Sequence, residues 1–280
     1  MSQSQTTAAQ TRATTARQPT FYISHGGGPA FWIDYPPPVG PRGFAGLRDF
    51  LGGLPDLLPA PPRAWLVVSA HWETAVPTVA TSPSPTMLYD YYGFPPVAYQ
   101  LQYPAPGAPD VARRAAALLQ GAGIDTAEDP DRGYDHGVFV PMMAVDPQAQ
   151  IPVAMLSLRH DLDPAFHLAV GAALAPLRDE GVVIIASGSS FHNLRTYFDG
   201  RPAEADAFDA WLVETATAGP ADRSARLVDW LSAPAARACH PREEHLLPLM
   251  VAAGAGAQDP GRQVYADRIG NKAFSGFMFG

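Results

Sequence analysis

Cysteine is nearly absent from this chain of 280 residues, which contains only Cys239. A single cysteine cannot form an internal disulfide, and this suits a protein of a reducing compartment. Basic residues are also in the minority, with 19 Lys and Arg against 27 Asp and Glu and a formal net charge of -8. This balance argues against nucleic acid as a partner. No basic amphipathic stretch is present either, so we expect no role at a membrane surface.

Long uninterrupted apolar runs are missing as well. No stretch approaches the roughly 18 consecutive apolar residues that a membrane-spanning helix needs. Residues 1–18 are rich in Ser, Thr, Gln and Ala and lack the apolar run of a signal peptide. This segment contains two arginines and no acidic residue, so a transit peptide is an alternative. A disordered tail is the simpler interpretation. We therefore expect a cytoplasmic protein with a disordered tail over residues 1–18.

Hydrophobic residues make up 47% of the chain, which is enough for one large core, and no linker divides the sequence after residue 18. Apolar runs predict strands at 21–25, 65–71, 76–81, 153–157, 182–186 and 273–280. Helical spacing predicts helices at 44–58, 110–121, 137–145, 164–179, 203–217, 221–232 and from 245 onward. Strands and helices alternate, so the sequence predicts one α/β domain with a mostly parallel or mixed central sheet flanked by helices.

Histidines follow three of the predicted strands. His25, His71 and His192 lie at or just beyond the ends of strands, and His245 opens the last predicted helix. In open α/β sheets, ligands bind outside the carboxyl ends of the strands. Imidazoles gathered at such a place are a common way to hold a catalytic transition metal. The pattern therefore indicates a metalloenzyme with its active site at the strand ends.

The histidines differ in the strength of their context. His25 and His71 have small neighbours that leave room for an ion, so we expect both to be ligands. His192 follows a turn of small residues and could be a third ligand or a general base. His136 is preceded by Asp135, which could instead be no more than a helix cap. His245 shares a helix face with Leu249 and points inward if that leucine belongs to the core.

Other candidates are weaker. His160 and His167 have polar neighbours and are interpreted as structural, and His240 precedes a proline outside the helix. Glu243 and Glu244 could supply a carboxylate, although acids are also favoured at a helix N-terminus by the helix dipole. Cys239 is more typical of a small buried residue than of a nucleophile. Two aromatic groups could bind a planar ligand or serve only for packing; they are residues 89–95 and the surroundings of Trp32 and Trp72.

Several well-known catalytic motifs are missing. The sequence has no His-Glu-x-x-His zinc helix, no P-loop and no Gly-x-Ser-x-Gly elbow. The three glycines at 26–28 follow a strand but lack the spacing of a dinucleotide-binding fingerprint. Hydrolase, nucleotide-binding and dehydrogenase chemistries of these types are therefore not indicated.

An ordered set of motifs resembles a known family. The set comprises SHGGGP at 24–29, SAHW at 69–72, YDYYGFP at 89–95, YPAPG at 103–107, GYDHGVFVPM at 133–142, LRDEGVVIIASGSSFHNLR at 177–195 and EHLLPLMVAAGA at 244–255. In this order and combination they resemble the class III (LigB-type) extradiol ring-cleavage dioxygenases, in the branch similar to DOPA 4,5-extradiol dioxygenases. The resemblance runs from about residue 21 to the end of the chain, so it implies that residues 19–280 form one catalytic domain.

The resemblance implies a mononuclear metal site that cleaves a catechol with O2 to give a semialdehyde. The expected substrates are similar to DOPA, caffeate or protocatechuate. The family's metal ligands correspond to His25, His71 and His245. His192 corresponds to the acid–base histidine, or to a further metal ligand, and His136 to a second histidine beside the substrate.

The resemblance leaves the metal and the reaction class to be tested. Fe(II) is expected for activity, whereas three neutral imidazoles also describe a Zn(II) site. A zinc-dependent hydrolase with the same histidines is one alternative. A binding protein without catalysis, of the Memo-like kind, is the other, and it is disfavoured because every expected histidine is present. The sequence does not specify the oligomeric state.

Overall fold

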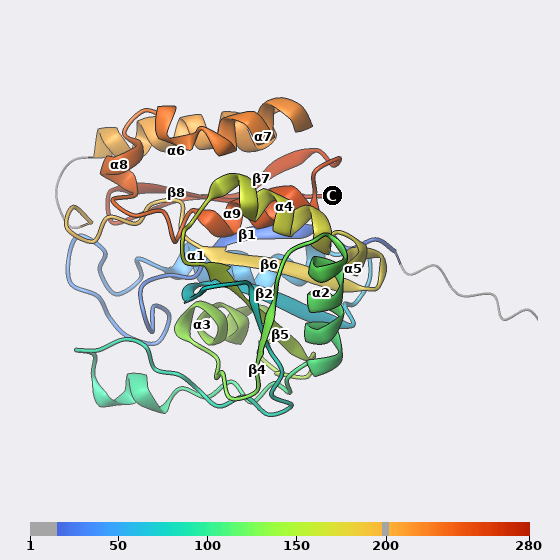
Figure 1. Ribbon diagram of the computed structural model, residues 1–280. Coiled ribbons are helices and arrows are strands. Elements are labelled where there is room, and N and C mark those ends of the chain that lie inside the picture. Colours follow the sequence, from blue (N-terminus) through green and yellow to red (C-terminus); the bar gives the residue numbers. More distant parts are fainter. Residues whose placement is uncertain (1–15, 198–201) are drawn as a thin grey trace, which may run out of the picture.

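The computed structural model of the protein describes residues 16–197 and 202–280, and a mixed β-sheet runs through this part of the chain (Figure 1). The sheet has eight strands in the spatial order β4 (Ala127–Asp129), β3 (Thr78–Ala80), β5 (Val153–Arg159), β2 (Ala64–Thr74), β6 (Val182–Gly188), β1 (Thr20–Ser24), β8 (Lys272–Phe279) and β7 (Gly261–Ile269). The predicted α/β class with a mixed sheet is confirmed.

The centre of the sheet is parallel. Strands β5, β2, β6 and β1 run in the same direction, and every residue of β1 and β6 is buried. Near-continuous apolar runs such as those of β2 and β6 are typical of strands that are covered on both faces. Strand β8 joins β1 in the antiparallel sense, and β7 forms the outer edge beside β8. The carboxyl ends of β1, β6 and β2 therefore meet at one edge of the sheet.

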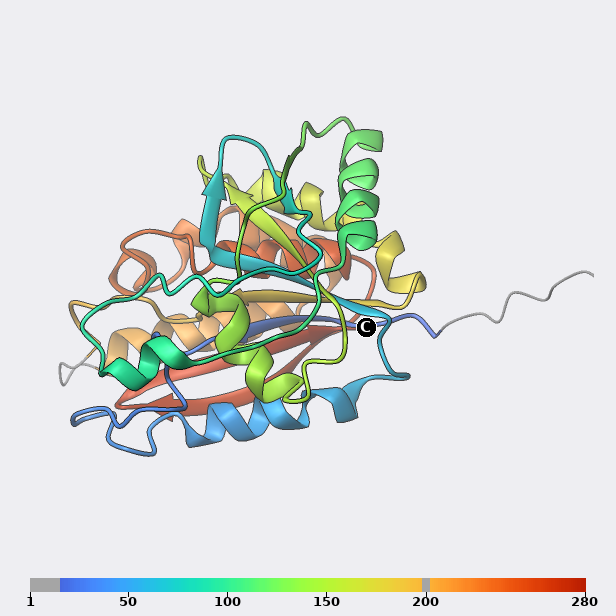
Figure 2. The same ribbon diagram turned by 90° about the horizontal axis from the view of Figure 1, so that it is seen from below.

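Helices cover both faces of the sheet. Helices α1 and α3 pack against each other on one face, where α3 contacts β2 and β6. Helix α9 contacts β1, β2 and β6 from the other face, with α4 packed outside it (Figures 1 and 2). The helices are α1 (Ala45–Gly53), α2 (Pro109–Gly121), α3 (His136–Val145), α4 (Pro164–Leu174), α5 (Pro176–Asp179), α6 (Pro202–Thr217), α7 (Pro220–Val228), α8 (Ala236–Cys239) and α9 (Leu247–Ala255).

Most predicted elements are present, and the differences have local causes. The helix predicted over 164–179 is divided into α4 and α5, because Pro176 has no N–H to continue the first helix. The helix predicted to open at His245 begins at Leu247, so His245 lies in the turn before it. Strands β4 and β7 were not predicted. The first is three residues long, and the second is a largely exposed edge strand with little apolar alternation.

The predicted tail over residues 1–18 lies largely outside the described residues, and it stays a prediction for residues 1–15. Within the described part, Gln18 is buried and its N–H donates to the carbonyl of Arg178 at 3.0 Å. The ordered chain therefore includes Gln18, directly before β1. A search of the described residues finds no helix with both the length and the apolar character to cross a bilayer.

One buried guanidinium ties several of these elements together. Arg178 in α5 is 1% exposed. It donates to the carbonyls of Gln18 at 2.6 Å, Ala255 at 2.8 Å and Phe279 at 3.4 Å, and it pairs with Asp259 at 2.5 Å. The start of β1, the end of α9 and the end of β8 thus share one donor group.

We expect Arg178→Met to lower the free energy of unfolding by about 3–5 kcal/mol, because it leaves buried acceptors and a carboxylate without a partner. The matched control is Arg226→Met, which removes an exposed ion pair with Glu214 at 2.6 Å. The control should change stability by less than about 1 kcal/mol. Urea unfolding of both variants measures the difference, and equal effects would contradict the structural role of Arg178.

Candidate active site

Five of the eight histidines converge on one cavity of about 330 Å³ at the carboxyl ends of the central strands. They are His25, His71, His136, His192 and His245. The ring centroid of His25 lies 4.9 Å from that of His71, 5.1 Å from that of His136 and 5.2 Å from that of His245. Each of these five histidines was a candidate from the sequence, and the fold brings all of them together.

His25 enters the cavity directly from β1. Its backbone N–H donates to the carbonyl of Gly188 at 3.2 Å and so extends the pairing of β1 with β6. Gly26 then turns the chain away with a φ of 84°, where a β-carbon would lie 2.5 Å from that of Ala30. Neither ring nitrogen of the buried His25 has a hydrogen-bond partner within the described residues. A buried imidazole without a partner is costly unless its lone pair meets a ligand such as a metal ion.

His71 and His245 face each other across the cavity floor. Their Nε2 atoms are 3.2 Å apart. Metal–nitrogen bonds of about 2.0–2.1 Å place the nitrogens of two imidazole ligands roughly 3.0–3.4 Å apart. The donor set therefore fits a metal ion. His71 does not end its strand as predicted, since β2 continues to Thr74 and its register with β5 shifts between Val68 and Glu73.

The turn that carries His245 packs directly on the end of β6. A β-carbon at Gly188 would lie 2.1 Å from the carbonyl oxygen of His245, so a side chain has no room there. The same carbonyl accepts from the N–H of Ser189 at 2.9 Å and from the hydroxyl of Tyr22 at 2.8 Å. The prediction that His245 points inward is confirmed by its burial, although the residue lies in a turn and not on a helix face.

Asp90 joins two of the histidines. Its Oδ1 accepts from the backbone N–H of His136 at 2.9 Å and lies 2.8 Å from Nδ1 of that residue, while Oδ2 lies 3.4 Å from Nδ1 of His71. Burial raises the pKa of the carboxyl, but hydrogen bonding and charge from His136 outweigh it and lower the pKa to about 2. An anionic Asp90 favours a proton on Nδ1 of both rings, which leaves the Nε2 lone pairs free.

Glu244 has the same role for the other two histidines. Its Oε1 lies 3.0 Å from Nδ1 of His245 and 3.2 Å from Nδ1 of His192. The two rings stack with centroids 3.3 Å apart and an interplanar angle of 16°. Burial raises the pKa of Glu244, yet a backbone hydrogen bond and the interactions with His192 and Arg242 together outweigh it, so the pKa is lowered overall. Glu244 was only one of two possible carboxylates in the sequence, and Asp90 was not recognised because aromatic residues surround it.

Asp135 does not cap α3 with its side chain. Its buried carboxylate accepts from the hydroxyl of Ser69 at 2.7 Å and from the guanidinium of Arg132 at 2.7 Å. Arg132 also donates to the backbone carbonyl of His71 at 3.3 Å. The alternative in which Asp135 is merely a helix cap is therefore wrong, because its carboxylate braces the strand that carries His71.

Burial keeps three of the five imidazoles neutral. The pKa values of His25, His71 and His245 are lowered well below the usual value, first by burial and then by the charge of neighbouring histidines. A neutral imidazole is the form that donates a lone pair to a metal. Desolvation therefore prepares these side chains as electron-pair donors.

The remaining candidates lie outside the cavity. His160 and His167 bond to backbone groups, as expected of structural residues. His240 is buried, and its Nε2 lies 3.0 Å from the carbonyl of Ser190. Glu243 pairs with Arg237. Burial raises the pKa of the Cys239 thiol to about 12, which does not suit a nucleophile.

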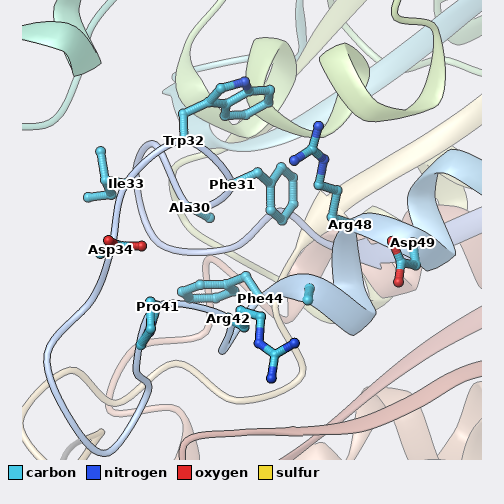
Figure 3. A pocket seen from close by; sticks show the side chains of 11 residues that line it. Ala30, Phe31, Trp32, Ile33, Asp34, Pro41, Arg42, Phe44, Arg48 and Asp49 are labelled. Atoms are coloured by element: carbon cyan, nitrogen blue, oxygen red, sulfur yellow. The ribbon is translucent and has the colours of Figure 1, made fainter.

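The predicted aromatic segment 89–95 forms part of the cavity wall. Tyr91, Tyr92 and Phe94 line the cavity, whereas Trp72 packs against the guanidinium of Arg132, 5.0 Å from its ring centroid. Trp32 lines a separate, more open hollow of about 480 Å³ between the loop after β1 and the start of α1 (Figure 3). No histidine is among the described residues that line this second hollow, so it offers no imidazole ligand for a metal.

Among the described residues, two triads of potential metal ligands each have their ligand atoms close enough together to hold one ion. The first is His25, His71 and His136, and the second is His192, Glu244 and His245; within each triad the ligand atoms lie within 4.8 Å of one another. The two triads meet where His71 and His245 approach, so they form one continuous donor cluster. Imidazole and carboxylate donors with room for a small molecule are typical of catalytic non-haem iron and zinc sites.

An α/β sheet with such a cluster at the ends of its strands is typical of metalloenzymes. Similarity to known proteins shows the family to which the chain belongs. A family profile described as the catalytic LigB subunit of aromatic ring-opening dioxygenase matches residues 44–276. The chain therefore belongs to the LigB family of aromatic ring-opening dioxygenases. The expected resemblance is confirmed, and the protein is a dioxygenase of this type.

Individual relatives cover most of the chain. This chain is 40% identical over 245 residues to a 4,5-DOPA dioxygenase extradiol from Beta vulgaris, and the aligned part covers 86% of this chain and 87% of the relative. It is 39% identical over 269 residues to dioxygenase tasH from Hapsidospora irregularis, covering 89% of this chain and 81% of the relative. The crystal structure of an uncharacterised protein from Escherichia coli K12 aligns with a TM-score of 0.74 and 30% identity over 94% of this chain and 100% of that one.

The lowered histidine pKa values predict the pH dependence of stability in the metal-free protein. Unfolded histidine has a pKa of about 6.5, so below this pH the unfolded chain binds protons that the folded chain does not. The corresponding stability is fully present above about pH 6.5 and is lost as the pH falls toward the folded values. Each of His25, His71 and His245 should contribute a slope of up to about 1.4 kcal/mol per pH unit.

Urea unfolding in chelator at several values between about pH 7.5 and 5.5 measures this slope. His25→Gln should reduce it, whereas replacing the exposed His160 by Gln should leave it unchanged. An unaltered slope in His25→Gln would show that the buried cluster does not cause the effect.

Proposed function

We propose that this protein is a metal-dependent extradiol dioxygenase that opens the ring of a catechol beside its two hydroxyl groups. Both atoms of O2 would enter the product, a ring-opened semialdehyde. The observation that carries the proposal is the convergence of five imidazoles on one aromatic-lined cavity in a chain of the LigB family.

His25, His71 and His245 are the proposed metal ligands. The unpaired ring nitrogens of His25 and the Nε2 separation of 3.2 Å between His71 and His245 support this choice. Fe(II) is the proposed working metal, because zinc has no redox couple to use with oxygen, and Zn(II) is the alternative occupant. When bound, the metal would supply a Lewis acid that lowers the pKa of the catechol hydroxyls and a redox couple for the reaction with dioxygen.

His192 is the proposed acid–base residue. Its Nδ1 faces Glu244, so its Nε2 is the atom that would take a proton from a catechol hydroxyl. The carboxylate of Glu244 would stabilise the imidazolium that forms. His192 would later return the proton to oxygen as the ring opens.

His136 is the second proposed catalytic histidine. Asp90 holds its Nδ1 at 2.8 Å, so a protonated His136 would direct its Nε2–H toward developing negative charge on oxygen. Each carboxylate therefore connects one proposed ligand with one proposed catalytic histidine: Asp90 joins His71 to His136, and Glu244 joins His245 to His192.

The names of the relatives guide the choice of substrates. Several are called 4,5-DOPA dioxygenase extradiol, so DOPA is the first catechol to test, with caffeate and protocatechuate beside it. The decisive experiment is anaerobic reconstitution with Fe(II), followed by addition of oxygenated buffer and each catechol. We expect oxygen uptake equal to the substrate consumed, together with a new visible absorbance from the ring-opened product.

The same experiment tests the competing functions. Protein loaded with Zn(II) is the control and should neither consume oxygen nor develop the absorbance. Hydrolysis of esters or amides by the zinc form without oxygen uptake would favour a hydrolase. Failure to bind any divalent metal stoichiometrically would favour a binding protein without catalysis.

A pair of substitutions separates metal binding from proton transfer. His192→Ala should retain one metal per chain and lower kcat by about 10²–10⁴-fold, because it removes the acid–base group. His25→Ala should lose the metal. Metal content by mass spectrometry and turnover by oxygen electrode measure both effects. Loss of metal from His192→Ala would instead make His192 a fourth ligand.

A further inference from the structure

Apart from the histidines, most side chains that line the active-site cavity are aromatic or apolar. They include Tyr35, Tyr91, Tyr92, Phe94, Phe191 and Leu194. Within residues 16–197 and 202–280, no lysine or arginine lines the cavity, and Asp90 is the only carboxylate that does. A negatively charged group held inside these walls would therefore meet no lysine or arginine of the described residues to offset its desolvation.

Two of the tyrosine hydroxyls and one serine hydroxyl of the cavity lining already donate to backbone carbonyls. Tyr35 donates to the carbonyl of Gly27, and Tyr91 donates to the carbonyl of Ala98. The hydroxyl of Ser189 donates to the carbonyl of Phe191 at 2.8 Å. These side chains have already used their O–H donors, so they offer ring faces and carbon atoms to a ligand.

The mouth of the cavity has an unusual surface. Tyr92 is 91% exposed and Leu194 is 68% exposed, and no other large apolar side chain in the described chain is as exposed as either. Both line the cavity. Exposed apolar groups that gather at one site mark a contact surface for a ligand. Solvent lies immediately beyond them.

We propose that the cavity recognises the ring substituent of its catechol by apolar contact with Tyr92 and Leu194, and that any charge on the substituent must reach the solvent beyond them. This inference rests on the proposed function, since it places the diol at the histidines. The substrates of this protein would then be catechols with an apolar chain at ring position 4 that extends to the mouth of the cavity.

The proposal separates catechols that otherwise look similar. A carboxylate attached directly to the ring, as in protocatechuate, would lie within the aromatic walls and lose its hydration. A carboxylate separated from the ring by two methylene groups, as in 3,4-dihydroxyphenylpropionate, would lie in water. The position of the charge, and not its presence, should therefore determine affinity.

Two matched pairs of ligands test this. In each pair a methyl group replaces a carboxylate of similar size: 4-methylcatechol against protocatechuate, and 4-propylcatechol against 3,4-dihydroxyphenylpropionate. Dissociation constants are measured by anaerobic calorimetry on the Fe(II) protein, so that binding does not depend on turnover. We expect the first pair to differ by at least about tenfold in favour of the methyl compound, and the second pair by less than about threefold.

A substitution at the mouth tests the apolar contact. Leu194→Ser should weaken binding of 4-propylcatechol by about threefold to tenfold and that of 4-methylcatechol by less than twofold, because only the longer chain reaches this residue. The matched control is Leu231→Ser, since Leu231 is 55% exposed and does not line the cavity. The control should leave both ligands unchanged.

The outcomes distinguish this inference from the proposed function. Protocatechuate that binds as tightly as 4-methylcatechol, or Leu194→Ser that weakens both alkyl catechols equally, would overturn the inference even if the ring is cleaved. If the catechols bind in the expected pattern but no oxygen is consumed, the inference about binding stands and the proposal that the protein cleaves catechols with O2 is wrong.

Discussion

The parallel alignment of β1, β6 and β2 is the constraint on which the active site depends. Ser24 pairs with Gly188 and Ser69 pairs with Ser187, so the ends of β1 and β6 lie level with the middle of β2, just before His71. Small residues at these positions leave the space into which the imidazoles project. His25 continues β1, and the turn with His245 rests on Gly188, where even a β-carbon would collide with its carbonyl oxygen. Side chains distant in sequence thus become neighbours through backbone pairing.

Electrostatics then determines what the gathered imidazoles can do. Five of them within a few ångströms would repel one another if all were protonated, and burial opposes their charged forms as well. Asp90 and Glu244 provide two fixed negative charges that orient the rings through Nδ1. Each carboxylate contacts one proposed metal ligand and one proposed catalytic histidine.

The sequence alone was sufficient to predict the structural features that depend on the local pattern of apolar residues. Buried parallel strands are continuous apolar runs, so β1, β2, β5 and β6 could be predicted, and with them the edge at which His25 and His71 lie. The edge strand β7 could not, because one exposed face and a neighbour on one side leave little pattern in its residues. His245 was expected on a helix because an apolar helix follows it, whereas the close packing against Gly188 holds it in a turn.

The carboxylate network was beyond sequence reasoning for a different reason. Asp90 is 46 residues from His136 in the chain, and nothing in its aromatic surroundings indicates a charged partner. Only the folded arrangement of the segment 89–95 against α3 brings them together. Pairings of this kind depend on tertiary contacts that have no spacing rule.

Arg178 has a consequence for the topology of the domain. Because one guanidinium bonds to the carbonyls of both Gln18 and Phe279, the start of β1 and the end of β8 lie within a few ångströms of a common point. Strands β1 and β8 are also direct neighbours in the sheet. Residues 18 and 279 therefore lie close together, and a circular permutant that joins them by a short peptide would keep the order of the strands. The junction lies away from the cavity mouth, so the histidine cluster would retain its surroundings.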